Sequence, residues 1–71
     1  ILEQITAKEL VQLIQKLPTG YRIIFNMYAL EGYTHREIAA ALNISVGTSK
    51  SQLSKARKAL QRQLAALFGT D

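Results

Sequence analysis

The sequence predicts an all-α domain of four helices, and three features lead to this prediction. Two segments, residues 6–9 and 34–37, begin with a threonine and end with a glutamate. At this spacing each side chain can accept from the free backbone N–H of the other at the start of a helix. Apolar residues then recur at the spacing of one helix face. No segment shows the alternation of apolar and polar residues that is typical of a strand.

The first helix is expected to begin after Thr6 and to end near Lys16. Pro18 disfavours helical geometry in the residue before it, so the chain must turn there. The apolar residues that recur on one face of this helix are Leu10, Leu13, Ile14 and Leu17.

A second helix is expected to begin around Thr19 and to close at Gly32, because glycine readily adopts the left-handed geometry that ends helices. We expect this helix to be mostly buried and to form the hub of the core, because it is the richest in large apolar groups. Phe25 and Tyr28 are therefore interpreted as core residues and not as stacking platforms for single strands. Its large apolar residues are Ile23, Ile24, Phe25, Met27 and Tyr28.

The third helix, through Leu42, and the fourth, to about Phe68, are expected to be joined by a tight turn of three residues. Asn43 is one of the few residues other than glycine that adopt left-handed geometry at modest cost. Ile44 follows as an apolar anchor. Ser45 can cap the fourth helix by accepting from a backbone N–H one turn further on.

Composition restricts the classes of protein to which the chain can belong. A length of 71 residues predicts one small domain, residues 1–71, and the absence of cysteine excludes a disulfide framework or a Cys-ligated zinc site. The apolar runs are far shorter than the roughly 18 residues of a membrane span, and no signal peptide is evident. We therefore expect a cytoplasmic protein, and the start at Ile1 instead of Met suggests a fragment of a longer chain.

The sequence offers no support for catalysis, a cofactor or a metal site. It contains no paired acids, no nucleophile beside a base and no glycine-rich phosphate loop. His35 is the only histidine and has no cysteine or carboxylate at a helical ligand spacing. His35 and Arg36 open the third helix, where either a contact with a phosphate or a solvated helix end is possible.

Positive charge is concentrated in the second half of the chain. Residues 1–37 contain four cations and four anions, whereas residues 38–71 contain five cations and one anion. Such a basic stripe is typical of a protein that binds a polyanion, although a solubilising face has the same composition. The five cations are Lys50, Lys55, Arg57, Lys58 and Arg62.

Two helices joined by a short turn, with small alanines in the first and polar residues leading the second, are the ingredients of a helix-turn-helix. Here it would span about residues 35–62 and have no wing, but plain structural corners have the same ingredients. When the residues of the fourth helix are placed at about 100° each around its axis, seven of them form one stripe that must face the core. These residues are Val46, Ser49, Leu53, Ala56, Leu60, Leu64 and Leu67. The opposite side comprises Gly47, Ser51, Ser54, Lys55, Lys58 and Arg62, flanked by Thr48, Lys50 and Arg57.

Gly47 lies in the first turn of the fourth helix and is less favourable there than alanine by roughly 1 kcal/mol. Either this turn must approach a DNA backbone closely, or the glycine is simply tolerated. The sequence leaves both interpretations open.

Residues 37–60, EIAAALNISVGTSKSQLSKARKAL, resemble region 4 of the bacterial sigma-70 family, especially the extracytoplasmic-function (ECF) sigma factors. Residues 17–34, LPTGYRIIFNMYALEGYT, are similar to the helix that precedes their helix-turn-helix. The resemblance covers roughly residues 17–64. It implies a domain that reads the −35 promoter element in the major groove while its apolar outer surface holds the flap of the RNA polymerase β subunit. An anti-sigma factor is a further implied partner.

The resemblance also implies roles for individual side chains. The base-facing set would be Lys50, Ser51, Ser54 and Lys55. Lys58 and Arg62 lie further along the fourth helix, where they suit phosphates. Arg22, at the start of the second helix, either reaches a phosphate or is a plain surface residue. The expected phosphate set is Arg22, Arg36, Thr48, Gln52, Arg57, Lys58 and Arg62.

Two positions depart from the family pattern. Ser49 stands where valine is usual, and a hydroxyl that faces the core needs a hydrogen bond, which we expect it to make with the carbonyl of Ser45. Gln52 stands where arginine is usual. The loss of one phosphate contact predicts a shallower salt dependence of DNA binding.

Two other functions remain open. A response-regulator effector domain also carries E-I-A and T-x-K in its helix-turn-helix, although its fourth helix normally ends sooner and dimerises. A protein-interaction module would bind RNA polymerase or an anti-sigma factor without DNA. If the chain is a sigma fragment without a promoter-melting domain, we expect it to bind DNA weakly and to initiate nothing.

Overall fold

The structure of the protein is a computed structural model that describes residues 5–68. Its elements are, in chain order, α1 (Ala7–Gln15), α2 (Thr19–Phe25), the π-helical segment η2 (Asn26–Leu30), α3 (His35–Leu42) and α4 (Val46–Phe68). Within residues 5–68 there is no strand, so the predicted all-α class with four helices is confirmed. None of the helices in this part of the chain has the length and apolar character needed to cross a membrane.

Both predicted capping patterns form at the starts of α1 and α3. Thr6 Oγ1 accepts from the backbone N–H of Glu9 at 3.1 Å, and Glu9 Oε1 accepts from the backbone N–H of Thr6 at 3.1 Å. The corresponding distances for Thr34 and Glu37 are 3.1 Å and 2.9 Å. Each box satisfies two backbone donors that a helix start otherwise leaves free, so both starts are set by local sequence.

The turn between α3 and α4 also follows the prediction. Asn43 has φ 57° and ψ 47°, which is left-handed geometry. The backbone N–H of Ile44 donates to the carbonyl of Ala39 at 3.0 Å and closes α3. Ser45 Oγ accepts from the backbone N–H of Thr48 at 2.9 Å and caps α4. The two helices are therefore joined by residues 43–45 alone.

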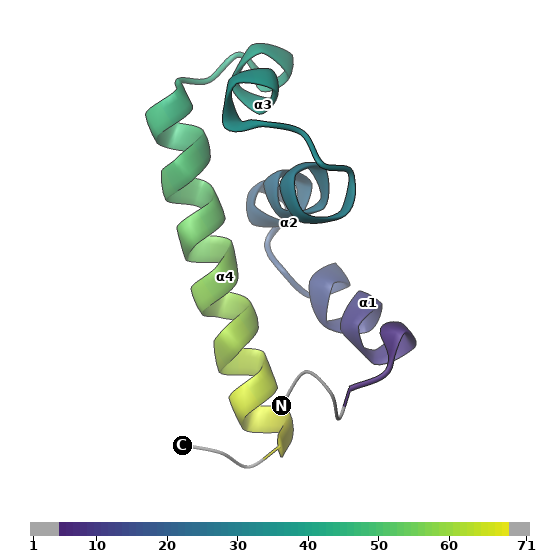
Figure 1. Cartoon of the computed structure of the whole chain (residues 1–71). Helices are drawn as coiled ribbons and strands as arrows, with labels where there is room; N and C mark the ends of the chain where they lie inside the picture. Colours follow the sequence, from purple (N-terminus) through teal and green to yellow (C-terminus); the bar gives the residue numbers. More distant parts are fainter. Residues whose placement is uncertain (1–4, 69–71) are drawn as a thin grey trace.

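The 23-residue α4 is the longest element, and the other helices lie along one side of it (Figure 1). At 1.5 Å per residue it is about 34 Å long. The segment α3 lies beside its first part, α2 beside its middle and α1 beside its last part. The side of α4 turned away from these helices is left uncovered by the described part of the chain.

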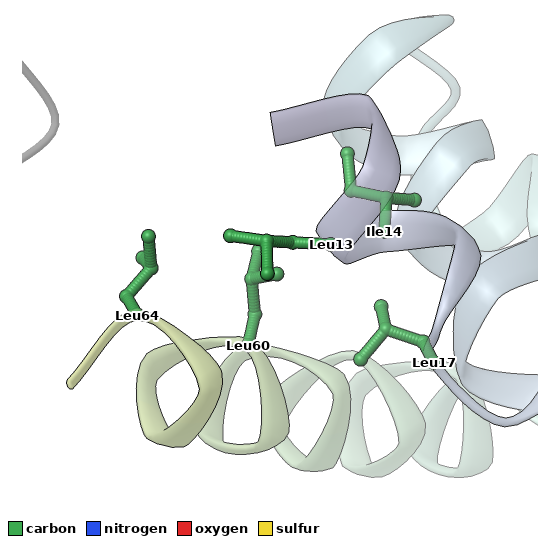
Figure 2. Packing of buried hydrophobic residues seen from close by; sticks show 5 residues of the cluster. All are labelled: Leu13, Ile14, Leu17, Leu60 and Leu64. Atoms are coloured by element: carbon green, nitrogen blue, oxygen red, sulfur yellow. The ribbon is translucent and has the colours of Figure 1, made fainter. Parts of the chain in front are cut away.

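Two clusters of buried side chains hold the short helices to α4. Leu13, Ile14 and Leu17 pack against Leu60 and Leu64 at one end, where Leu13 and Leu60 point toward each other (Figure 2). Closer to the turn, the second cluster comprises Ile24, Ile38 and Leu53.

Most of the predicted inner stripe of α4 is buried, from Ser49 through Leu64, but its two ends are not. Val46 is 38% exposed and Leu67 is 52% exposed. The stripe runs the whole length of α4, whereas the two buried clusters contact it only between Leu53 and Leu64. The prediction was therefore wrong for the ends, because helical periodicity does not tell how far the packing partners extend.

The second helix is less buried than predicted. Ile24 is its only buried residue, Ile23 is 41% exposed and Leu30 is 60% exposed. The helix packs on one side only, so apolar residues on its other sides remain at the surface. Its last turn is π-helical, with the backbone N–H of Glu31 donating to the carbonyl of Asn26 at 2.9 Å. The predicted left-handed glycine is confirmed at Gly32, with φ 78°.

The left-handed geometry of Asn43 leads to a stability prediction. Asn43→Ala should destabilise the fold by about 1 kcal/mol, because a Cβ without a polar group to bond the backbone is strained there. Asn43→Gly should be nearly neutral and serves as the matched control. Urea unfolding followed by helical circular dichroism measures both, and equal stability of the alanine variant and the parent would contradict the assignment.

Candidate nucleic-acid interface

The uncovered face of α4 is polar, basic and free of carboxylates. Residues 46–68 contain five cations and no Asp or Glu, so no acidic side chain of this helix offsets their charge. The four residues predicted to face DNA bases are all exposed on this helix, as are the cations that follow them. These exposed residues are Lys50, Ser51, Ser54, Lys55, Arg57, Lys58 and Arg62. Their exposure on one helix makes this face the candidate site.

Some of the predicted residues gather in a recess between the start of α3 and α4. The recess contains three cations, one imidazole and an apolar floor formed by Leu53. Its lining residues are His35, Lys50, Leu53, Ser54, Arg57, Lys58 and Gln61. The structure thus brings together two members of the predicted base-facing set and two of the predicted phosphate set on this flank of α4.

Thr48 and Gln52 lie on the other flank of α4. There they line a mainly apolar groove together with Ile23, Ile24 and Ile44. Thr48 Oγ1 also accepts a hydrogen bond from Ser45 Oγ at 2.8 Å, so its side chain is held in the cap of α4. Its own hydroxyl proton remains free to be donated to a ligand.

The structure does not place Arg22 and Arg36 in the recess. Arg22 is half-buried and donates through Nη1 to the carbonyl of Gln15 at 3.2 Å, at the end of α1. It lines a groove with Val11 and Leu30, which belong to α1 and η2. Arg36 is exposed on α3.

A buried polar pair connects α3 to α4 at this site. Ser49 is 0% exposed, and its Oγ lies 2.9 Å from Nδ1 of His35. The expected bond from the Ser49 hydroxyl to the carbonyl of Ser45 is not observed, and that carbonyl accepts the backbone N–H of Ser49 at 3.0 Å. His35 instead supplies a nitrogen from the neighbouring helix.

His35 is also held by an aromatic neighbour. Its ring stacks on Tyr28 with the centroids 4.5 Å apart and the planes inclined by 21°. The guanidinium carbon of Arg57 lies 5.8 Å from the centroid of the same tyrosine, within the range of a cation–π interaction. His35 is therefore not a freely solvated helix end, which was one of the two sequence interpretations.

Sequence reasoning missed the cluster of Tyr28, His35, Ser49 and Arg57, although one signal for it was available. Ser49 was identified as a hydroxyl in an apolar stripe, and such a group needs a partner. The partner is 14 residues away in the chain, a distance at which helical periodicity gives no information. The pairing depends on how α3 crosses α4.

The pairing of a serine with a histidine raises the question of nucleophilic catalysis. Ser49 has no exposed surface, so a substrate cannot reach its hydroxyl. Across residues 5–68, no group of three His, Cys, Asp or Glu side chains gathers as a metal site would require. The chemistry that this site offers is hydrogen bonding and positive charge at a surface.

Comparison with known proteins identifies relatives of the chain. The sequence model of the family described as "Sigma-70, region 4" matches residues 7–60. The chain is similar to the ECF RNA polymerase sigma factor SigW of Bacillus subtilis (strain 168), with 40% identity over 53 residues, which are 75% of this chain and 28% of SigW. It is also similar to the ECF RNA polymerase sigma-E factor of Escherichia coli (strain K12), with 33% identity over 55 residues, 78% of this chain and 29% of the relative.

The chain thus spans less than a third of the length of these curated relatives. No solved structure matches it.

The buried pair predicts non-additive effects on stability. Ser49→Ala should cost about 1 kcal/mol and His35→Phe about 2 kcal/mol, because each leaves a polar partner without its hydrogen bond. The double variant should cost less than the sum by about 1 kcal/mol, since it leaves neither group unpaired. Urea unfolding of the four proteins gives the coupling energy. Strict additivity would mean that the two side chains do not interact.

Proposed function

Since the chain belongs to the sigma-70 region 4 family, we propose that it recognises the −35 element of bacterial promoters as the C-terminal domain of an ECF sigma factor. One observation supports this most strongly. The exposed face of α4 contains five cations and no carboxylate, on a helix that follows a three-residue turn. A helix about 10–12 Å across fits a major groove of about 12 Å.

The first half of α4 would read base edges. Lysine ammonium groups donate to guanine O6 and N7, and serine hydroxyls both donate and accept, so this face can discriminate among base pairs in the major groove. Gly47 leaves the start of α4 open for close approach of the DNA. A Cβ added at this position would meet only Ser45 Oγ within 4 Å, at 3.8 Å. The proposed base-facing residues are Lys50, Ser51, Ser54 and Lys55.

Phosphates would be bound on both flanks of this face and beyond it. Such contacts set the position of the helix on the duplex and dominate affinity. Arg22 is not in this set, because it lines the groove between α1 and η2 and not a surface of α4. The proposed phosphate-directed residues are Arg36, Thr48, Gln52, Arg57, Lys58 and Arg62.

RNA polymerase, through its β flap, is the proposed protein partner. The groove between α1 and η2 has exposed apolar walls, with Val11 49% and Leu30 60% exposed. An anti-sigma factor would compete for such apolar surface. The proposed binding of promoter DNA and of RNA polymerase would take place in the cytoplasm, and neither role is enzymatic.

Two of the sequence interpretations are separated by these findings. The family match to sigma-70 region 4 supports the sigma interpretation over a response-regulator effector domain. The length of α4, which continues to Phe68, supports it as well. The proposed domain is residues 1–71, with its helix-turn-helix at about residues 35–62, as a part of a longer chain.

Selection from a random duplex pool followed by salt titration tests the proposal. The selected duplex should bind more tightly than an unrelated one, and the logarithm of the binding constant should fall by about 0.9 per neutralised phosphate for each decade of salt. Lys8→Ala, which removes an exposed lysine from α1, is the control and should bind as the parent does. Binding that is absent or insensitive to salt would contradict the DNA proposal and favour a protein-interaction module.

Two cations on α4 are expected to contribute in different ways. Lys55→Ala should reduce the discrimination between promoter variants, because Lys55 is proposed to reach base edges. Arg62→Ala should weaken all duplexes alike, because phosphate contacts carry no sequence information. Competition binding with the selected duplex and its single-base variants measures both effects. The reverse outcome would show that the opposite end of α4 enters the groove.

Gln52 allows a gain of contact to be tested. Gln52→Arg should add one phosphate contact and steepen the slope of log binding constant against log salt by about 0.9. Gln12→Arg places the same charge on an exposed position of α1 and should leave the slope unchanged. An equal change in both variants would indicate a general effect of net charge and not a contact at position 52.

A further inference from the structure

The buried Ser49 hydroxyl sets the hydrogen-bonding state of His35. Ser49 is 0% exposed, and Nδ1 of His35 is the one side-chain atom within hydrogen-bond distance of its Oγ in residues 5–68. A buried hydroxyl that only accepts would leave its own proton unpaired, which is costly. The Ser49 hydroxyl therefore has a partner for its proton when it donates to Nδ1 of His35. In this tautomer the imidazole is neutral and carries its proton on Nε2.

The same contacts orient the Nε2–H group. The two ring nitrogens point in diverging directions, so we infer that a ring bonded to the buried Ser49 through Nδ1 directs Nε2 away from Ser49 and toward the surface. Tyr28 stacks on one side of the ring and limits its rotation. His35 lines the recess between α3 and α4 that also contains Lys50, Arg57 and Lys58. The outward N–H is thus added to a recess that already has three cations.

The chemistry of this recess matches a phosphate group. Three cationic side chains and one neutral N–H donor surround a space in which no lining residue is acidic. A phosphodiester has one negative charge and oxygens that only accept, so it complements donors of both kinds. The first helix of a helix-turn-helix crosses the DNA backbone, and His35 is the first residue of that helix.

We propose that His35, Arg57 and Lys58 hold one phosphodiester of the DNA backbone in this recess, and that His35 donates to it through Nε2–H. Ser49 is the positioning residue, since it acts only through His35. The proposal rests on the DNA-binding function proposed above and adds a specific contact to it: a neutral donor that fixes the register of α4 on the duplex. Tyr28 contacts two donors of the recess, because its ring stacks on His35 and also lies within cation–π range of the Arg57 guanidinium.

The test combines a protein variant with a chemically modified duplex. The double variant His35→Phe/Ser49→Ala keeps an aromatic ring beside Tyr28 and leaves no unpaired hydroxyl. Each phosphate of the selected duplex is replaced in turn by an uncharged methylphosphonate. At one position the parent protein should lose about tenfold in affinity, the worth of a hydrogen bond to a charged group. The double variant should bind the unmodified duplex about tenfold more weakly and should lose much less at that position.

One control and two distinct outcomes separate failure of this proposal from failure of the proposed function. Lys8→Ala should show the same methylphosphonate profile as the parent. If the double variant binds the duplex as tightly as the parent, or is weakened equally at every phosphate, the His35 contact is overturned while DNA binding stands. If the parent binds no duplex, the proposed function itself fails.

The single histidine permits a direct spectroscopic test of the tautomer. Long-range proton–nitrogen spectra should show the proton of His35 on Nε2 in the parent and a mixture of tautomers in Ser49→Ala. The selected duplex should shift the Nε2 signal, and the duplex with a methylphosphonate at the coupled position should not. An equal shift with inorganic phosphate at matched ionic strength would indicate a general anion site and overturn the assignment to DNA.

Discussion

The packing of three short helices against a single stripe of α4 determines what the rest of the molecule can do. Leu53, Leu60 and Leu64 of α4 anchor both buried clusters, and each cluster draws its partners from the same side of the helix. The residues opposite that stripe receive no packing from the described part of the chain, so their composition is free to serve a ligand. They contain hydroxyls and cations and no carboxylate.

The crossing of α3 and α4 is the place where this packing becomes a binding geometry. The turn at residues 43–45 is too short to allow much variation, and Ile38, which is 0% exposed, holds α3 against the second cluster. At the same crossing the buried Ser49 pairs with His35. A polar contact in a core is stable only when its groups satisfy each other. The pair therefore fixes how the start of α3 sits relative to α4.

The features of the fold that depend on neighbouring residues could be predicted from the sequence. Thr34 and Glu37 are three residues apart, and the left-handed residue and the cap of α4 lie within the same short turn, so local chemistry was enough. Features that depend on packing could not. Leu30 is apolar yet 60% exposed, because burial depends on the presence of a covering element and not on the residue itself. The π-helical turn at η2 had no local signal.

In the candidate site, too, features within one helix could be predicted from the sequence, whereas contacts between helices could not. Periodicity along α4 was sufficient to separate its inner stripe from its exposed basic face. It was not sufficient to show that Arg57 lies over Tyr28, or that Arg22 turns to the end of α1. Those contacts join residues from different helices. Residue types on one helix predicted the chemistry of the surface, whereas the arrangement of the recess followed only from the tertiary structure.

The central claim is that the carboxylate-free face of α4 lies against duplex DNA. Titrating the isotopically labelled chain with the selected duplex and following every backbone amide by NMR tests this most directly. We predict that the largest shifts fall in the first half of α4 and at the start of α3, with α1 almost unchanged. Shifts confined to α1 and η2, with the amides of α4 unaffected, would contradict it.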